Sequence, residues 1–340
     1  MPWQPRNKYC WDSWYYRQGN TLHAFYLQAS QFACVYLPEK RHGLASIGHA
    51  VLTDFGWKEI NPDKSALERR EGDHWDNLVT WTGSIYEENG LYYLFYTGKR
   101  IEDTPVETPQ ERRRPQNIGV ATSSDLIHWT RTPATEAGPV IPHPDANSKF
   151  DGSNWRDPWV IKDAVDEKYY AFICARPSDS PPDRGGLIAY ATSDDLEHWQ
   201  EEPYRVLYRS DEHYLLETPQ VFWRRMNDGQ WRCYLIFGPH WSPFFTQKIP
   251  IGVTLYVRSR PIADRSQLQY DRIPWEEEPA NILCNYLYAG KLVDLEATYP
   301  LFYGFQKEDE SGRFVGGISD PLWAGFTADG HIELVDFKPN

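Results

Sequence analysis

Residues 118–129 read IGVATSSDLIHW, and residues 188–199 repeat the same pattern as IAYATSDDLEHW. Looser copies of this run surround Gly48, Gly252 and Gly317, so that five copies follow one another at a spacing of about 70 residues. A segment that recurs at a regular period indicates one supersecondary unit repeated along the chain. The sequence therefore predicts a repeat fold that fills the chain.

Each copy is preceded by a second run that reads as a strand. These runs, rich in aromatic and aliphatic residues, are residues 22–27, 92–96, 169–173, 233–237 and 299–303. No helical periodicity is sustained, and the 26 prolines work against long helices. We therefore expect an all-β fold, in which a single five-bladed β-propeller with four-stranded antiparallel blades spans residues 1–340 as a catalytic domain.

The composition favours a carbohydrate as the ligand. Aromatic residues make up 15% of the 340 residues, including 15 Trp and 22 Tyr, and tryptophan offers a large rigid face to a sugar ring. The net charge of −13 argues against nucleic acid, which requires a basic surface. We expect a small-molecule carbohydrate substrate and no nucleic-acid partner, and the oligomeric state stays open.

Location and cofactors are predicted from what the sequence does not contain. The first residues, MPWQPRN, include no apolar region, and no apolar run approaches the length of a membrane span. The five cysteines are widely scattered, and no grouping of His, Asp and Cys has the spacing of a metal site. We therefore expect a cytoplasmic protein that binds no membrane, with reduced core thiols, no metal and no cofactor.

The stretch NWRDPWVI, residues 154–161, places an arginine and a carboxylate between two tryptophans. Pro158 fixes its own φ and biases Asp157 toward an extended conformation, which predicts a stiff strand entrance. Arg156 and Asp157 offer a donor and an acceptor to sugar hydroxyls, and Trp155 offers an apolar face. A buried Arg–Asp pair that braces a turn is the alternative interpretation.

Carboxylates stand at comparable positions of three repeats. Asp12 lies in WDSW (residues 11–14), ahead of the first strand-like run, and Glu217 lies in LLETPQVF (residues 215–222), ahead of the fourth. Asp157 stands ahead of the third. Because equivalent strand starts converge at one end of a propeller channel, we expect the three side chains to meet there. Such a group suits acetal hydrolysis, in which one carboxylate acts as nucleophile or base and another donates a proton.

Five short motifs, in chain order, resemble those of a known family. They are HAFYLQ (23–28), IGHA (47–50), WTGS (81–84), RDP (156–158) and ETP (217–219), similar to the family's H-L-F-Y-Q, W-G-H-A, aromatic-S-G-S, R-D-P and E-C-P. The sequence thus resembles the furanosidase clan of five-bladed propellers. Within that clan it is most similar to the β-fructosidases of glycoside hydrolase family 32 and their levansucrase-like relatives.

The resemblance implies a role for each candidate residue. It implies Asp12 as the nucleophile, Glu217 as the acid/base and Asp157 as the stabiliser of the transition state. It also implies a furanose subsite, and the tryptophans near the motifs are candidate sugar platforms. The residues of this predicted subsite and its platforms are Gln28, Trp81, Ser84, Arg156, Trp11 and Trp155. The implied activity is retaining hydrolysis, with or without transfer to sugar acceptors, of β-fructofuranosides such as sucrose or fructo-oligosaccharides.

The sequence departs from the family pattern at several points. WDSW lacks the Asn and Pro that flank the nucleophile in W-M-N-D-P-N-G, and Gln28 lies one residue later than the pattern. Glu217 is followed by TPQ instead of CPD, and the fifth repeat ends the chain, so we expect no C-terminal β-sandwich. Two alternatives stay open: a clan-related arabinofuranosidase or xylosidase, and a non-catalytic sugar-binding propeller that has lost its nucleophile motif.

Overall fold

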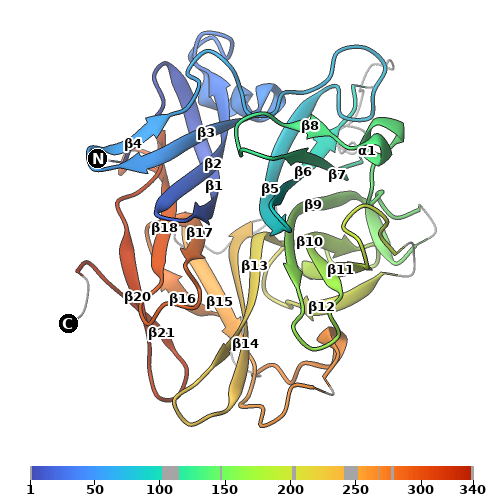
Figure 1. Ribbon diagram of the computed structural model, residues 1–340, viewed down its shortest axis with the longest axis vertical. Helices are drawn as coiled ribbons and strands as arrows, with labels where there is room; N and C mark the ends of the chain where they lie inside the picture. Colours follow the sequence, from blue (N-terminus) through green and yellow to red (C-terminus); the bar gives the residue numbers. More distant parts are fainter. Residues whose placement is uncertain are drawn as a thin grey trace.

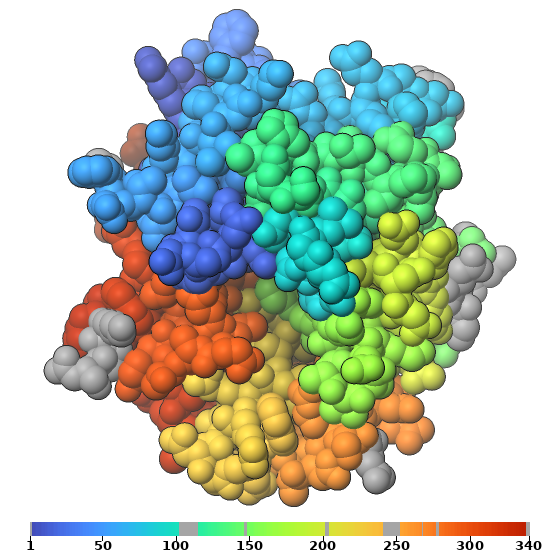
Figure 2. Space-filling model, viewed as in Figure 1, coloured from blue at the N-terminus to red at the C-terminus, as the bar shows by residue number. Residues whose placement is uncertain are grey.

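The computed structural model describes residues 2–101, 115–145, 148–200, 204–240, 252–266, 268–276 and 279–337. In these ranges the strands form five antiparallel sheets around a central channel (Figure 1). The prediction of an all-β, five-bladed propeller is therefore confirmed. The blades lie side by side around the ring in chain order, and blade one meets blade five (Figure 2).

The first four blades are four-stranded sheets. Blade one contains β1 (Lys8–Gln18), β2 (Thr21–Ser30), β3 (Ser46–Thr53) and β4 (Gly56–Glu59). Blade two contains β5 (Val79–Glu88), β6 (Leu91–Lys99), β7 (Asn117–Ser123) and β8 (Thr130–Arg131). Blade three contains β9 (Phe150–Lys162), β10 (Tyr169–Pro177), β11 (Leu187–Ser193) and β12 (Arg205–Arg209). Blade four contains β13 (Leu215–Arg225), β14 (Trp231–His240), β15 (Thr254–Arg258) and β16 (Asn281–Cys284).

The fifth blade has one short additional strand, which pairs with its second strand. Its strands are β17 (Tyr288–Val293), β18 (Leu301–Glu308), β19 (Phe314–Gly316), β20 (Leu322–Phe326) and β21 (Ile332–Val335). The helical segments of the described ranges are α1 (Pro133–Ala137) and the 3₁₀ turns η1 (Pro38–Leu44) and η2 (Tyr270–Arg272). None of these three segments has the length and apolar character that crossing a membrane requires.

The repeated segments SSDLIHW and SDDLEHW form the same turn in blades two and three. The carboxylate of Asp125 accepts hydrogen bonds from the main-chain N–H groups two and three residues further on, both at 2.8 Å, and Asp195 does the same at 3.0 and 2.8 Å. The tryptophan that ends each segment donates its indole N–H to the main-chain oxygen of Leu126 or Leu196, at 3.1 and 3.0 Å. The repeat is therefore visible in the sequence because each copy closes its own turn with its own side chains.

The hydrophobic core lies between adjacent blades. Trp14 of blade one packs in one cluster with Leu94 of blade two, and Phe172 of blade three packs in another with Leu235 of blade four. All five cysteines are buried and unpaired, as the sequence predicts for core thiols. Packing of sheet against sheet fixes the relative positions of the strands that surround the channel.

At one comparable point, the innermost strand of each blade carries one residue more than the strand beside it. In β1 the extra residue is Asp12, and in β5 it is Thr82. In β9, β13 and β17 the extra residue falls at 157–158, 218–219 and 289–290. A β-bulge of this kind bends the strand and redirects the side chains next to it. The channel is thus surrounded by five bulges at comparable positions.

Two expectations about the local structure of Asp157 are wrong. Asp157 lies within β9 instead of ahead of a strand, and its φ of 60° is left-handed instead of extended. The bulge in β9 requires this conformation, and it outweighs the preference for extended geometry that Pro158 creates. Asp12 and Glu217 also lie within innermost strands, so the three carboxylates converge at bulges and not at strand starts.

Main-chain pairing between the N-terminal segment and blade five closes the ring. Trp3 and Ile318 exchange two main-chain hydrogen bonds of 2.8 Å, and the N–H of Gly317 donates to the carbonyl of Cys10 at 2.8 Å. The Trp3 ring also packs edge-on against Tyr26, with ring centroids 5.6 Å apart. The first and last blades are therefore joined by backbone hydrogen bonds as well as by side-chain packing.

Candidate active site

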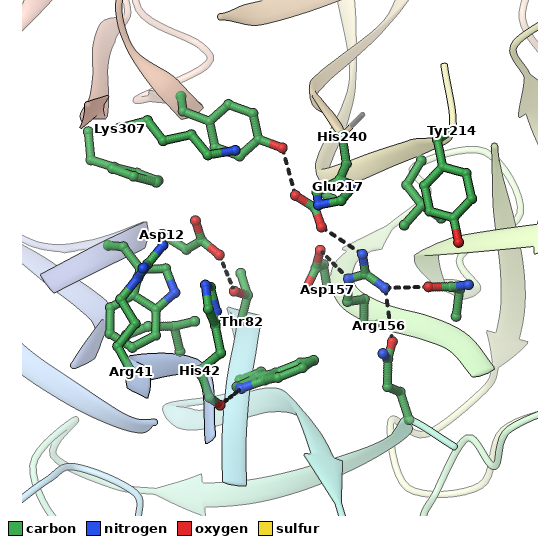
Figure 3. Close-up of a pocket in the computed structure, with 18 residues that line it drawn as sticks. Asp12, Arg41, His42, Thr82, Arg156, Asp157, Tyr214, Glu217, His240 and Lys307 are labelled. Atoms are coloured by element: carbon green, nitrogen blue, oxygen red, sulfur yellow. Dashed lines mark hydrogen bonds and ion pairs between the residues drawn. The ribbon is translucent and has the colours of Figure 1, made fainter. Parts of the chain in front are cut away.

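A pocket of about 350 Å³ lies within the propeller, and residues of all five innermost strands line it. This volume falls in the range of small-molecule binding sites. The three candidate carboxylates, Asp12, Asp157 and Glu217, are all part of its lining (Figure 3). The structure thus brings together groups that lie far apart in the sequence.

Asp12 reaches the pocket from the bulge of β1. Its Oδ2 accepts a hydrogen bond from Thr82 Oγ1 at 3.0 Å, so the extra residues of β1 and β5 contact each other between blades. Burial, reinforced by the negative charge of Glu217, raises the pKa of Asp12 to about 6. Asp12 can therefore hold a proton well above the usual pH range of a carboxyl group.

Asp157 is the most enclosed of the three carboxylates, with 5% of its surface exposed. Its Oδ2 accepts a hydrogen bond from the main-chain N–H of Thr218 at 2.9 Å, and its own N–H donates to Thr97 Oγ1 at 2.9 Å. Burial raises the pKa of Asp157 to about 7, although the Arg156 guanidinium, 3.7 Å away, opposes the shift. The Thr97 bond therefore holds the main chain at Asp157, and the Thr218 bond orients its carboxylate.

Glu217 accepts a strong hydrogen bond on each carboxylate oxygen (Figure 3). Oε1 accepts from Arg156 Nη2 at 2.6 Å, and Oε2 accepts from the Tyr288 hydroxyl at 2.6 Å. Burial acts to raise the pKa of Glu217, but His240, Arg156 and the Tyr288 hydrogen bond outweigh it and hold the pKa well below its usual range. In the free protein Glu217 is therefore ionised when Asp12 is protonated.

The two groups of side chains face each other across the pocket. Figure 3 shows Asp12 beside Arg41 and Thr82 on one side, and Glu217 beside Arg156 and Asp157 on the other. A substrate bond held in the space between Asp12 and Glu217 has a carboxylate on each side. This arrangement is suited to displacement at an acetal carbon.

Three more of the predicted residues line the pocket: Trp11, Trp81 and Arg156. The indole N–H of Trp81 donates to the main-chain oxygen of His42 at 2.9 Å, which fixes its ring at the pocket wall. Trp11 is only 2% exposed, so it offers little of its surface to a ligand. Arg156 Nη1 donates to Asn154 Oδ1 at 2.9 Å, which orients the guanidinium that holds Glu217.

The structure does not bring Gln28, Ser84 or Trp155 into the pocket. Leu27 lines the pocket instead, so Gln28, one residue later on the same strand, faces a separate cavity. Ser84 is fully buried and accepts the main-chain N–H of Val160 at 3.1 Å. Trp155 is fully buried against neighbouring aromatic rings, because its neighbour in the strand, Arg156, points into the pocket.

Sequence reasoning missed several residues of the lining, among them Arg41, His42, Tyr288 and Lys307. Arg41 and His42 belong to η1, a connection whose position over the channel has no sequence signature. Tyr288 precedes the bulge of β17, as Glu217 precedes that of β13. A position-by-position alignment of the blades in the sequence could have identified Tyr288.

The family described as "Glycosyl hydrolases family 32 N-terminal domain" matches residues 15–266 of the chain. The matched range contains Asp157 and Glu217 and begins after Asp12. No curated protein sequence matches the chain.

Solved structures with a similar fold include three proteins named for sugar chemistry. Sucrose-6-phosphate hydrolase from Lactobacillus gasseri superposes with a TM-score of 0.66 and 18% identity, over 92% of this chain and 58% of that one. Inulosucrase from Halalkalicoccus jeotgali bound to kestose gives 0.67 and 18%, over 99% and 91%. Fructan 1-exohydrolase IIa from Cichorium intybus in complex with 1-kestose gives 0.67 and 16%, over 98% and 59%. At these identities the likeness establishes the fold, and this chain spans less than two thirds of the first and third proteins.

Proposed function

The chain belongs to glycosyl hydrolase family 32, and from this we propose that it is a retaining glycoside hydrolase that acts on β-fructofuranosides such as sucrose or fructo-oligosaccharides. The observation that carries the proposal is the convergence of Asp12, Asp157 and Glu217 on one pocket from three different blades. Two of these carboxylates face each other across the pocket, as a double displacement at an acetal carbon requires (Figure 3).

In the proposed reaction Asp12 attacks the anomeric carbon of the fructosyl unit and forms an ester bond with it. The bond from that carbon to the leaving oxygen breaks, and Glu217 gives its proton to the leaving oxygen. Water then attacks the same carbon while Glu217 takes a proton from it, and the ester bond to Asp12 breaks. Both carboxyl groups return to their starting states. A sugar hydroxyl in place of water gives transfer by the same steps.

Asp157 has a supporting part in this proposal. Its carboxyl group forms hydrogen bonds with fructosyl hydroxyls, and the positive charge that develops on the ring in the transition state favours its ionised form, which accepts these bonds more strongly. Thr97 and Thr218 already fix the orientation of Asp157, so little reorganisation is needed when the sugar binds. Trp81 offers the sugar an apolar face.

The reaction requires a proton on Glu217, whereas the free protein favours it on Asp12. Arg156 and Tyr288 keep Glu217 ionised through their two hydrogen bonds. A fructosyl unit whose oxygens accept these two donors frees the carboxylate from them, and the pKa of Glu217 then rises. Binding of the substrate therefore favours the reactive arrangement of the proton.

The test is the release of free sugar from sucrose, fructo-oligosaccharides and inulin, with aryl arabinofuranosides and xylosides alongside. We expect fructose release by the wild-type protein and a loss of about a thousand-fold or more in kcat for Asp12→Asn. Asp54→Asn, at an exposed carboxylate, is the matched control and should keep full activity. A Glu217→Gln protein with undiminished activity would refute the acid/base assignment.

The same experiment separates the alternatives. The anomeric configuration of the first product, read by NMR, distinguishes retention from inversion. Release of arabinose or xylose with inversion would identify a clan-related enzyme of another specificity. Tight sugar binding without turnover by the wild-type protein would identify a non-catalytic sugar-binding propeller.

One observation favours a phosphorylated fructoside as a second candidate substrate. Arg41 and Lys307 line the pocket, and within the described part of the chain neither forms an ion pair with a carboxylate. The Arg41 guanidinium stacks on Phe314 with its Nε unpaired, and the Lys307 ammonium lies over the Tyr288 ring at 4.5 Å. Cations that form no ion pair within the described residues suit an anionic ligand, and one structural neighbour is named a sucrose-6-phosphate hydrolase.

Comparison of sucrose with its 6-phosphate tests this second candidate. We expect Lys307→Gln to lower kcat/KM for the phosphate ester by about ten-fold more than the value for sucrose, because the effect of this cation on Glu217 is common to both sugars and its contact with the phosphate is not. Equal losses for both sugars would exclude a phosphate subsite at Lys307.

A further inference from the structure

A lysine lies buried next to the candidate carboxylates but outside the pocket lining. Lys291, on β17, is 2% exposed, and its Nζ donates a hydrogen bond to the main-chain carbonyl of Thr218. Burial of an ammonium group is costly unless partners of opposite charge or good acceptors lie nearby. The Thr218 carbonyl and the nearby aspartates offset part of this cost for Lys291.

Thr218, the residue that Lys291 holds, lies in the bulge of β13 directly after Glu217. Its φ of 50° is left-handed, a conformation that a β-branched residue adopts only when its surroundings impose it. The Thr218 carbonyl accepts the hydrogen bond from Lys291, while the Thr218 N–H donates to Asp157 Oδ2 at 2.9 Å. One strained residue thus links Lys291 to both Glu217 and Asp157.

The charge of Lys291 acts on two of the carboxylates. Burial lowers the pKa of Lys291 to about 8, and the negative charges of Asp157 and Asp12 oppose that shift. The interaction is reciprocal, so the ammonium favours the ionised forms of both aspartates. The other charged or titratable groups around them are Cys10 from β1, Arg41 and His42 from η1, Arg156 from β9, Cys174 from β10, Glu217 from β13, His240 from β14, Tyr288 from β17 and Lys307 from β18.

We infer that Lys291 is a positioning residue of this site: it fixes Glu217 relative to Asp157 through the Thr218 carbonyl, and its charge favours the ionised aspartates. The inference deepens the proposed function and rests on it. Lys291 has no access to the substrate, so its effect passes through Thr218 and through the electric field. These two contributions can be separated by substitution.

Three variants separate the hydrogen bond from the charge. K291Q keeps a donor for the Thr218 carbonyl and removes the charge, K291R keeps both, and K291M removes both. We expect K291Q to move the alkaline limb of the pH profile of kcat/KM, which reports Asp12, upward by about one unit, because Asp12 loses a nearby cation. We expect K291M to show the same shift together with a fall in kcat of about 10- to 100-fold and little change in KM. K291R should retain the wild-type profile.

Lys8→Met is the matched control. Lys8 also donates to a main-chain carbonyl, that of Pro62 at 2.7 Å, and to Glu59 at 2.8 Å, but it lies outside the pocket. We expect this variant to lose stability without any shift of the pH profile. If K291M behaves in the same way, with lower stability and an unchanged profile, Lys291 is only a structural residue and the inference is wrong.

Two further readouts keep the test decisive. If K291M does not fold, K291Q decides, because an unshifted profile in that variant refutes the charge effect. A carbon-13 NMR titration of the side-chain carboxyls in the wild type and in K291Q does not depend on turnover. Higher carboxyl pKa values for Asp12 and Asp157 in K291Q would support the inference even if no sugar of the panel were cleaved, and unchanged values would overturn it.

Discussion

Asp12 and Glu217 differ in their surroundings, and this difference decides where their shared proton resides. Asp12 accepts one hydrogen bond, from a neutral hydroxyl, whereas Glu217 accepts one from a guanidinium and one from a phenol. Burial is the main cause of the raised pKa of Asp12, whereas nearby charge and hydrogen bonds outweigh burial and lower the pKa of Glu217. The two groups titrate as a coupled pair, so rate profiles report the pair and not either residue alone.

The pH dependence of the proposed reaction follows from this pair. The pair holds one proton only above the low pKa of Glu217 and below about 6, the value for Asp12. Above that pH both groups are ionised, and no proton is left for the leaving oxygen. We therefore expect kcat/KM for sucrose to fall as the pH rises through about 6. A profile that continues to rise above about pH 7 would contradict this assignment of the proton.

Asp12→Asn should be inactive and more stable than the wild type. The folded-state pKa of Asp12 lies above its unfolded value, so the native state binds the extra proton and its stability falls as the pH rises from about 4 to about 6. The asparagine side chain does not ionise in this pH range, so the variant does not lose this stability. We expect the free energy of unfolding of the variant to exceed that of the wild type by about 1–3 kcal/mol above pH 6, with little difference near pH 4. Urea unfolding at several pH values measures the difference.

At the scale of the element, the five bulges explain how strands deliver catalytic groups. A regular strand alternates its side chains between two faces, and one inserted residue breaks the alternation at a chosen point. The insertion in β1 is itself the proposed nucleophile, and the insertion in β5 is the threonine that contacts it. The site is therefore built from irregularities that recur in each blade.

Gly83→Ala tests the importance of the bulge in β5. A Cβ at Gly83 would lie 1.7 Å from the main-chain oxygen of Phe95, so strands β5 and β6 cannot keep their present pairing. We expect a loss of about 3 kcal/mol or more in the free energy of unfolding, together with loss of the Asp12–Thr82 contact and of activity. Gly43→Ala, where a Cβ meets nothing within 4 Å, is the control and should be nearly neutral in thermal unfolding.

The sequence predicts some elements of this fold and not others, for physical reasons. The turn at Asp125 is local, because its side chain bonds to the next few main-chain groups, so the repeat and the five blades follow from the sequence. A bulge depends on how two strands pair, which the residues of one strand do not show. The left-handed φ of Asp157 was therefore not predicted. Gln28 faces away from the pocket for a similar reason, since a shift of one residue reverses the side of the strand.

At the scale of the whole molecule, the ring is closed by a short segment near the N-terminus. Trp3→Ala removes the ring that packs against Tyr26 beside the pairing with Ile318. We expect a loss of about 1–3 kcal/mol in stability. Activity should fall in parallel, because both β1 and β17 line the pocket. Phe55→Ala, at a fully exposed side chain, is the control, and a Trp3 variant with normal thermal unfolding would show that the closure carries little of the stability.

The closure of the ring also sets the order of events in biosynthesis. The pocket takes side chains from Trp11 to Lys307, and the pairing that joins the first blade to the last needs Ile318. After the first blade has emerged from the ribosome, most of the remaining chain must still be synthesised before the last blade is available to pair with it. The nascent chain therefore contains all but one of its blades before the pocket can form. Catalysis begins only when the last blade has left the exit tunnel.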